Sequence, residues 1–259
     1  MNSSNEPSVR SEQTVNQPRK AASALELLQQ EVICCSRCPR LNSYCAEIGR
    51  VKRRAYLDWD YWAKPVPSFG DPEARLLILG LAPGAHGSNR TGRMFTGDGS
   101  GQTLYRVLHR TGFASQPTSR SRDDGLRLMD AYITAAARCA PPGNKPTTQE
   151  IRNCRSFLER ELELLPNVRI VLALGKVAWD VYLSVLRDRG VIRSRTPYVF
   201  GHNRMYRIAP GIAPGIAPDQ PILMGSYHPS QQNTSTGKLT EKMLVDVFRR
   251  AQKILTTVE

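Results

Sequence analysis

The sequence predicts an α/β fold, with a mostly parallel central sheet flanked by helices on both faces. From residue 75 onwards, apolar runs of strand length alternate with segments of helical periodicity. The runs are continuously apolar, which is typical of strands buried on both faces of a parallel sheet. Parallel neighbours need a crossover connection, and the helical segments supply one.

Each expected element follows from its own pattern. Strands are expected at Arg75–Ala82, Asp130–Ala136, Asn167–Leu174 and Pro221–Ser226. Helices are expected at Ala21–Val32, Gly101–Phe113, Thr147–Leu165, Lys176–Arg189 and Thr240–Leu255. Thr147 and Glu150 have the spacing of a capping box, which marks the start of their helix.

The length of 259 residues fits one large domain with a tail. Residues 1–20 are polar and contain no aromatic side chain, so we expect a disordered N-terminal arm followed by a single domain over residues 21–259. Within it the pattern weakens at about 193–220, where Ala209–Pro218 repeats Ala-Pro-Gly-Ile. Proline and glycine exclude regular structure there, and we interpret the segment as a loop insertion without assigned function.

Composition narrows the functional class. The chain has 36 Lys and Arg against 23 Asp and Glu, a net charge of +13, which favours a polyanionic partner such as nucleic acid. No apolar run approaches the roughly 20 residues that span a bilayer, and the first twenty residues lack the apolar region of a signal peptide. We therefore expect a cytoplasmic protein without membrane contact. Nothing indicates an obligate oligomer, so a monomer is expected.

Six cysteines in a reducing compartment favour metal or cluster ligation over disulfides. Cys35 and Cys38 form a Cys-x-x-Cys corner, and Cys139 and Cys154 lie far along the chain. Such a set can bind Zn²⁺ or a [4Fe–4S] cluster, and the spacing does not choose between them. The alternative is that the two distant cysteines are buried as small apolar residues.

Two segments that follow expected strands are candidates for ligand binding. The first, Gly80–Asp98, reads GLAPGAHGSNRTGRMFTGD and leaves the carboxyl end of its strand, where open α/β sheets bind ligands. It lacks the ending of a P-loop, which disfavours a nucleoside triphosphate. The second, Tyr227–Thr240, places His228 before a proline at a strand end, ahead of several hydroxyl and amide side chains, and we favour a functional over a structural role for this histidine.

Together, four blocks resemble the uracil-DNA glycosylase superfamily, and within it the iron–sulfur-containing family 5 enzymes. The blocks are Cys35–Leu41, Gly80–Asp98, Arg138–Thr147 and His228–Thr240, in the order of that family. The resemblance implies hydrolysis of the bond between a deaminated base and deoxyribose in DNA, leaving an abasic site. Uracil is the expected substrate, with hypoxanthine and other modified bases also expected.

The resemblance also implies roles for individual residues. A [4Fe–4S] cluster is expected on Cys35, Cys38, Cys139 and Cys154, with Cys34 and Cys45 as spares. Substrate contacts are expected from Gly80, Leu81, Pro83, Gly84, Phe95, Ala135, Pro229 and Ser230, with Phe95 stacking on the flipped base. Catalytic roles are expected for His228, Ala82, Asp98 and Asn89.

Two positions shape the expected mechanism. Most relatives have a carboxylate or Asn in the first motif where this chain has Ala82, so catalysis is expected to depend on stabilising the departing base. His228 would donate to its O2, assisted by the backbone N–H groups of Ala82–Ala85. Asp98 is the candidate carboxylate and Asn89 the next; the alternative for Asp98 is a turn residue. A related iron–sulfur family has Asn after the threonine at the end of one strand, whereas Ala135 follows Thr134 here, which predicts relaxed base specificity.

Other functional classes remain as alternatives. A non-catalytic iron–sulfur module that binds DNA or senses redox state would share the same cysteines. A zinc-dependent deaminase is disfavoured because its His-x-Glu and Pro-Cys-x-x-Cys arrangement is absent. In the glycosylase interpretation, DNA phosphates are expected to follow the basic residues Arg50, Lys52, Arg53, Arg54, Arg90, Arg93 and Lys238.

Overall fold

The central sheet of the computed structural model, which describes residues 12–208 and 220–257, has six strands in the order β1-β3-β2-β4-β6-β5. The four inner strands are β3 (Ala131–Ala135), β2 (Leu76–Gly80), β4 (Ile170–Leu174) and β6 (Ile222–Ser226), all parallel. The short edge strands β1 (Phe69–Gly70) and β5 (Met205–Tyr206) are antiparallel to their neighbours. The predicted fold class is confirmed.

The register aligns the carboxyl ends of the inner strands. Gly80 pairs with Ala135, and Leu174 pairs with Ser226. The segments that leave these four strands therefore emerge along one edge of the sheet. Both motif segments singled out above start at that edge.

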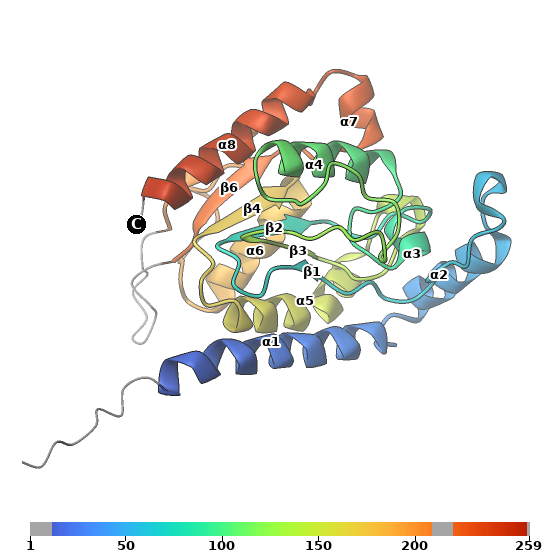
Figure 1. Ribbon diagram of the computed structural model, residues 1–259, viewed down its shortest axis with the longest axis horizontal. Helices are drawn as coiled ribbons and strands as arrows, with labels where there is room; N and C mark the ends of the chain where they lie inside the picture. The colour runs from blue at the N-terminus through green and yellow to red at the C-terminus, as the bar shows by residue number, and fades with distance from the viewer. Residues whose placement is uncertain (1–11, 209–219, 258–259) are drawn as a thin grey trace, which may run out of the picture.

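Helices cover both faces of the sheet (Figure 1). The longer helices are α1 (Glu12–Ile33), α2 (Pro39–Val51), α4 (Gly99–Arg110), α5 (Thr148–Leu164), α6 (Lys176–Asp188) and α8 (Glu241–Thr257). Short helical turns are η1 (Arg54–Tyr56), α3 (Ser88–Thr91), η2 (Pro142–Asn144) and α7 (Gln231–Ser235). Helices α4 and α8 contact each other on one face, and α5 contacts both α6 and α1 on the other.

The two faces of the sheet build two separate cores. Along β2, Ile78 packs in the core shared with α4 and α8, whereas Leu77 packs in the core shared with α5 and α6. Every residue of the four inner strands is buried. This two-sided burial is the physical reason why the strands are almost entirely apolar in the sequence, with Thr134 and Ser226 as the exceptions.

The five predicted helices and four predicted strands are all present, and apart from the start of α1 their ends differ by one to a few residues. The capping box is confirmed: the Thr147 hydroxyl accepts from the Glu150 N–H, and the Glu150 carboxylate accepts from the Thr147 N–H at 2.7 Å. The edge strands and α2 were not predicted. An edge strand of two residues is too short to show a period.

The first helix starts nine residues before its predicted start at Ala21. Helix α1 begins at Glu12, so residues 12–20 are helical rather than part of a disordered arm. This stretch contains Glu, Gln, Arg and Lys, which are good helix formers and extend the helix that the apolar pattern begins further along. The remainder of the predicted arm, residues 1–11, and the whole repeat at 209–218 lie outside the described residues. None of the described helices is long and apolar enough to cross a membrane.

Candidate active site

A cavity of about 680 Å³ lies at the carboxyl edge of the sheet. Its walls come from the segments after β2, β3 and β6, together with η1. Eight residues that the sequence singled out line it: Leu81, Ala82, Gly84, Phe95, Asp98, Ala135, His228 and Ser230. The parallel register thus brings segments distant in sequence to one site.

Four predicted site residues do not line this cavity: Gly80, Pro83, Asn89 and Pro229. Gly80 lies directly behind the ring of Phe95. A Cβ at this position would lie 2.9 Å from Cζ of Phe95, so the absence of a side chain leaves room for the ring. Asn89 is fully buried, and its side-chain amide donates to the carbonyl groups of Cys45 and Ala85 at 3.4 Å. Asn89 thus connects α2 to the first motif and does not line the cavity, and its buried Oδ1 has no hydrogen-bond partner among the described residues.

Phe95 and His228 face each other in the cavity wall. Their ring centroids are 5.7 Å apart, with 30° between the planes. Phe95 has a φ of 52°, an uncommon conformation for a bulky residue. The backbone of Gly101 packs closely against that of Phe95 and fixes this conformation, since a Cβ at Gly101 would lie 1.6 Å from the Phe95 carbonyl oxygen. The ring is therefore held in place before any ligand binds.

His228 is held as a neutral side chain. Burial lowers the pKa of its imidazole to about 4, so at neutral pH the ring carries one N–H and no charge. Its backbone carbonyl accepts from the Asn233 amide at 2.9 Å, and Ser230 caps α7 by accepting from the Asn233 N–H. A neutral imidazole can donate a hydrogen bond without first taking up a proton.

Asp98 is both a helix cap and part of the cavity wall. Its Oδ1 accepts from the Gly101 N–H at 2.9 Å, at the start of α4. Burial raises the pKa of this carboxyl group, against the opposing effects of two backbone N–H groups and the charge of Arg90. Its Oδ2 occupies the space beside Gly87, where a Cβ would lie 2.1 Å away. Asp98 therefore has a local structural role at the start of α4, as the alternative of a turn residue expected. It also lines the cavity, which leaves it available to a ligand.

Sequence reasoning missed several cavity residues. His86 lines the cavity, and its Nδ1 lies 3.0 Å from the Tyr61 hydroxyl. Burial and the charges of Arg53 and Arg90 lower the pKa of His86. Asn144 also lines the cavity. It is the last residue of η2 and has a left-handed φ of 57°. The signal for it was its place in a Pro-Pro-Gly-Asn turn, since Asn tolerates this conformation. Tyr56, Ser88, Ser100, Gln231 and Gln232 complete the missed polar lining, and Arg53, which was predicted to face DNA phosphates, lines the cavity as well.

The wall contributed by β3 is apolar. Ala135 lines the cavity, while the hydroxyl of the preceding Thr134 donates to the Glu161 carboxylate at 2.6 Å inside the protein. Glu161 also pairs with Arg138 at 2.5 Å, and both side chains are almost fully buried. The polar side chain at the end of this strand therefore stabilises the core and does not reach the cavity.

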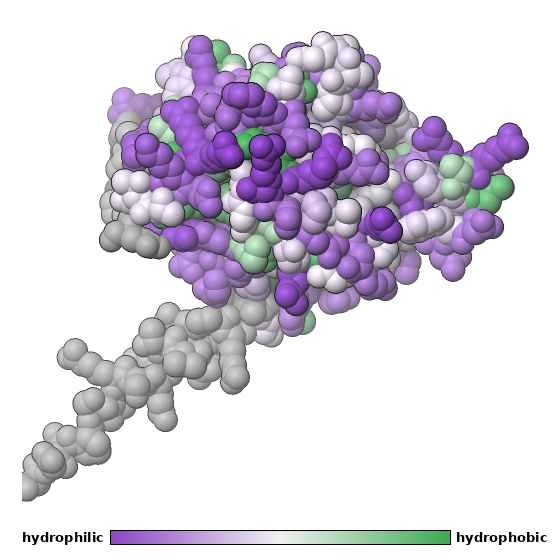
Figure 2. Space-filling model, turned by 45° about the horizontal axis from the view of Figure 1, so that its top comes forward, coloured by the Kyte–Doolittle hydropathy of each residue, from purple (hydrophilic) through white to green (hydrophobic). Residues whose placement is uncertain are grey.

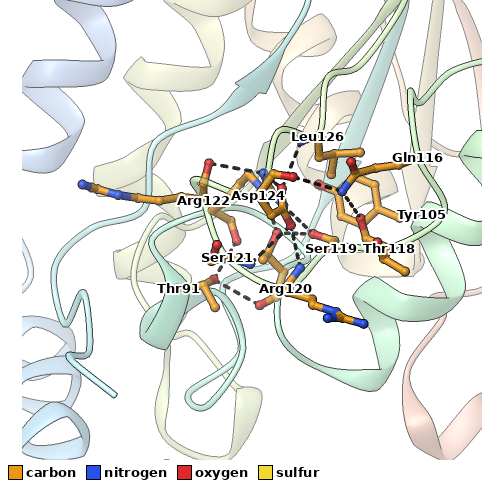
Figure 3. A network of polar contacts seen from close by, with 12 residues as sticks. Thr91, Tyr105, Gln116, Thr118, Ser119, Arg120, Ser121, Arg122, Asp124 and Leu126 are labelled. Atoms are coloured by element: carbon orange, nitrogen blue, oxygen red, sulfur yellow. Dashed lines mark hydrogen bonds and ion pairs between the residues drawn. The ribbon is translucent and has the colours of Figure 1, made fainter. Parts of the chain in front are cut away.

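Arg93 stabilises the segment that carries Phe95. The Arg93 guanidinium is 3% exposed and lies 2.8 Å from the carboxylate of Asp124. It also donates to Ser119 and Thr96, within the network that Figure 3 draws around Asp124 and Ser119. Burial raises the pKa of Asp124, but its hydrogen bonds, above all from Arg93, outweigh this and lower it to about 2. The network joins the first motif to the 119–126 loop.

The prediction that Arg90 and Arg93 face DNA phosphates is wrong. Both side chains are 3% exposed. Arg93 is neutralised by Asp124, and the Arg90 guanidinium lies between the rings of Tyr56 and Trp59, at 3.9 and 4.1 Å from their centroids. Their partners are acidic and aromatic side chains far along the chain, which the spacing of the motif could not indicate.

The cysteines come together from three segments. Cys35 and Cys38 lie between α1 and α2, Cys139 follows β3, and Cys154 is on α5. A hydrogen bond with Cys45, burial and the neighbouring Cys154 and Cys35 raise the pKa of Cys139. Burial, with smaller effects from Cys38 and Cys35, raises that of Cys154 against the opposing effect of Arg138.

All four predicted ligands therefore lie within electrostatic reach of others in the set. Across residues 12–208 and 220–257, however, no three His, Cys, Asp or Glu side chains have the arrangement of a metal site. Cys45, predicted to be a spare, is buried beside Cys139. Cys34 is exposed.

Comparison with known proteins identifies the family. The family model of the Uracil DNA glycosylase superfamily matches residues 67–252. A type-5 uracil-DNA glycosylase of Thermus thermophilus is 48% identical over 88% of this chain and 97% of its own length. One from Mycobacterium leprae is 47% identical over 90% and 96%. A type-4 uracil-DNA glycosylase of Sulfurisphaera tokodaii is 26% identical over 59% and 55%. The chain therefore belongs to the uracil-DNA glycosylase superfamily, in its type-5 group.

Proposed function

We propose that this chain excises uracil, and also hypoxanthine and other deaminated bases, from DNA by hydrolysing the N-glycosidic bond and leaving an abasic site. The observation that carries the proposal is the pairing of a rigid aromatic ring, Phe95, with a half-buried neutral imidazole, His228, in one wall of a cavity. The type-5 relatives are named for uracil excision, which supports the same activity here.

Base binding comes first. The target base must leave the stack, which costs a few kcal/mol and least for a mismatched base such as uracil opposite guanine. Phe95 offers the extruded base a stacking surface, worth about 1–3 kcal/mol. Because Gly80 and Gly101 already hold this ring, binding the base requires no reorganisation of the wall.

Bond cleavage then places negative charge on the departing base and positive charge on the sugar. The N–H of His228 would donate to O2 of uracil, and backbone N–H groups of Ala82–Ala85 would assist. Preorganised donors of this kind are worth about 2.7–4 kcal/mol each in comparable sites. A neutral donor also fits a leaving group that must depart as an anion, since no proton transfer is required before cleavage.

The attacking water needs a position opposite the departing base. Ala82 offers no carboxylate, whereas the Asp98 carboxyl group lines the same cavity. We propose that Asp98 orients this water and stabilises the developing positive charge on the sugar. The position of Asn89 behind the wall gives no support for its predicted catalytic role.

Broad substrate range follows from the apolar contribution of β3. A pocket that hydrogen-bonds one base edge rejects analogues strongly, because its own polar groups would be left unpaired. Ala135 presents no such group, and Thr134 is engaged with Glu161. Uracil, hypoxanthine and 5-hydroxymethyluracil are therefore expected to be accepted, with selectivity set largely by how easily each base leaves the duplex.

We further propose that a [4Fe–4S] cluster is held by Cys35, Cys38, Cys139 and Cys154. The donor set fits: it consists of thiols alone, three of them buried, and Cys139 and Cys154 each interact electrostatically with other cysteines of the set. Bound there, the group would supply a cross-link between the α1–α2 corner, the end of β3 and α5. None of the four cysteines lines the cavity, which supports a structural role.

The test of the function is direct. The purified chain, as a monomer in solution, is incubated with duplexes containing uracil, hypoxanthine or 5-hydroxymethyluracil opposite guanine, and alkali-labile abasic sites are measured. Excision of all three supports the proposal, and excision of uracil alone contradicts the broad range. DNA binding without any abasic product would favour the alternative of a non-catalytic module.

A further inference from the structure

The turn that follows α2 projects from the body of the molecule. This tip segment, residues 51–59, extends away from the sheet at the end of α2 (Figure 1). Two of its large apolar side chains are exposed, Val51 by 55% and Leu57 by 56%. Figure 2 shows hydrophobic atoms among hydrophilic ones on the projection at the right of that view. Exposed apolar side chains on a projection are typical of an interaction surface.

The tip segment is held firmly on the cavity wall. Lys52 Nζ donates to the Leu57 carbonyl oxygen at 3.0 Å and closes the turn. Tyr56 and Trp59 hold the Arg90 guanidinium between their rings. Arg90 in turn donates to the carbonyl groups of His86 and Gly97, at 2.8 and 2.7 Å. The projection is therefore fixed to the first motif by a buried cation, and its exposed side chains have a defined position relative to the cavity.

The charge of the tip segment is complementary to a polyanion. It carries three cationic side chains, Lys52, Arg53 and Arg54, against one carboxylate, Asp58. In the described part of the chain, neither Arg53 nor Arg54 forms an ion pair, unlike Arg50, which is paired with Glu47. The tip is also continuous with the active site, because Arg53 and Tyr56 line the cavity that contains His228.

We propose that the tip segment is a second DNA contact, which holds the strand beside the extruded nucleotide. Arg53 and Arg54 bind phosphates, and Leu57 packs against a sugar or the wall of a groove. Phosphates that flank an extruded base must pass close to the cavity that receives it, and Arg53 of the tip lines this cavity, with Arg54 next to it in the chain. Apolar side chains next to basic ones are common in proteins that engage deformed DNA. The inference rests on DNA as the substrate but not on the identity of the excised base.

The experiment measures binding, so that it does not depend on excision. The dissociation constant for a duplex carrying a stable abasic-site analogue is measured over a series of salt concentrations. Arg54→Gln is expected to weaken binding about fivefold at low salt and to reduce the salt slope by about 0.9, the value for one lost phosphate contact. Leu57→Gln is expected to weaken binding about fivefold with an unchanged slope, because it removes apolar contact only.

Matched controls are available on surfaces away from the tip. Lys253→Gln, at an exposed position late in α8, matches the charge change, and Leu27→Gln matches the apolar change, since Leu27 is 65% exposed on α1. Both controls should bind like the wild type, and unchanged Tm values show that all four variants are folded. If the tip variants bind with the affinity and salt slope of their controls, the tip segment is only a solvated surface and the inference is overturned.

Discussion

Phe95 and His228 lie 133 positions apart in the sequence, yet their rings are 5.7 Å apart, centroid to centroid, in one wall of the cavity. Phe95 reaches this position from the loop before α4, and His228 from the end of β6. The first offers a stacking surface and the second a hydrogen-bond donor. Their separate contributions can be distinguished by substitution.

Phe95→Ala is expected to lower kcat/KM for uracil excision by about 5- to 100-fold, the equivalent of the stacking energy of one base. Phe95→Leu keeps the bulk of the side chain without its aromatic face, so its kcat/KM should lie between those of the wild type and Phe95→Ala. The measurement is excision from a uracil–guanine duplex at low substrate concentration. Equal rates for the wild type and the Ala variant would exclude stacking on this ring.

His228→Ala is expected to lower the single-turnover rate by about two to three orders of magnitude, because a preorganised donor to the departing base is lost. His228→Gln restores an N–H donor and should recover part of the rate. Because the pKa of this imidazole is about 4, its role should persist unchanged from pH 8 down to about pH 5. Unimpaired excision by the Ala variant would contradict the assignment.

The same group affects stability in acid. The unfolded histidine takes up a proton near pH 6.5, whereas the folded one does so only near its pKa of about 4. The free energy of unfolding of the wild type should therefore fall as the pH drops through this window. In His228→Ala this part of the decrease should be absent, which urea unfolding at pH 7 and pH 4.5 can measure.

Asp98→Asn separates a catalytic role from a capping role. Asn is as good a helix cap as Asp, so α4 should remain intact and the Tm should change little. If the carboxylate orients water, the single-turnover rate should fall by about tenfold or more. Wild-type activity should also decline as pH falls through the raised pKa of Asp98, and the variant should lack this decline. A rate equal to that of the wild type would restrict Asp98 to the helix cap.

Gly87→Ala tests the position of the same carboxylate. The new methyl group would lie 2.1 Å from Oδ2 of Asp98, which must then move. We expect a loss of activity similar to that of Asp98→Asn, about tenfold. Gly99→Ala is the control, because a Cβ there meets nothing within 4 Å. In an Asp98→Ala background, Gly87→Ala should lower the excision activity little further. A second loss of the same size would show that Gly87 acts independently of Asp98.

Cys154→Ser tests the proposed cluster. The wild type, purified without oxygen, should be brown and contain about four iron atoms per chain. The variant should lose most of this iron and have a lower Tm, because a cross-link to α5 is lost. Cys34→Ser, at an exposed position, should retain iron and colour. A colourless wild type containing zinc would contradict the cluster, and iron loss in the Cys34 variant instead would reassign the ligands.

Much of the fold could be predicted from local patterns in the sequence. The apolar runs predicted β2, β3, β4 and β6 because burial on both faces favours an apolar side chain at nearly every position. The cap at Thr147 was predictable because its hydrogen bonds join residues three apart. The start of α1 was not, since polar residues are compatible with both helix and coil.

At the site, the sequence by itself determined which segments meet, because parallel strands bring their carboxyl ends to one edge. Only the tertiary structure decided which side chains face the cavity. Asn89, Arg90 and Arg93 belong to the same motif as Asp98, but each is buried by partners far along the chain. A charged side chain can be buried only where an ion pair, a hydrogen bond or an aromatic ring compensates its lost hydration, and the fold alone supplies such partners.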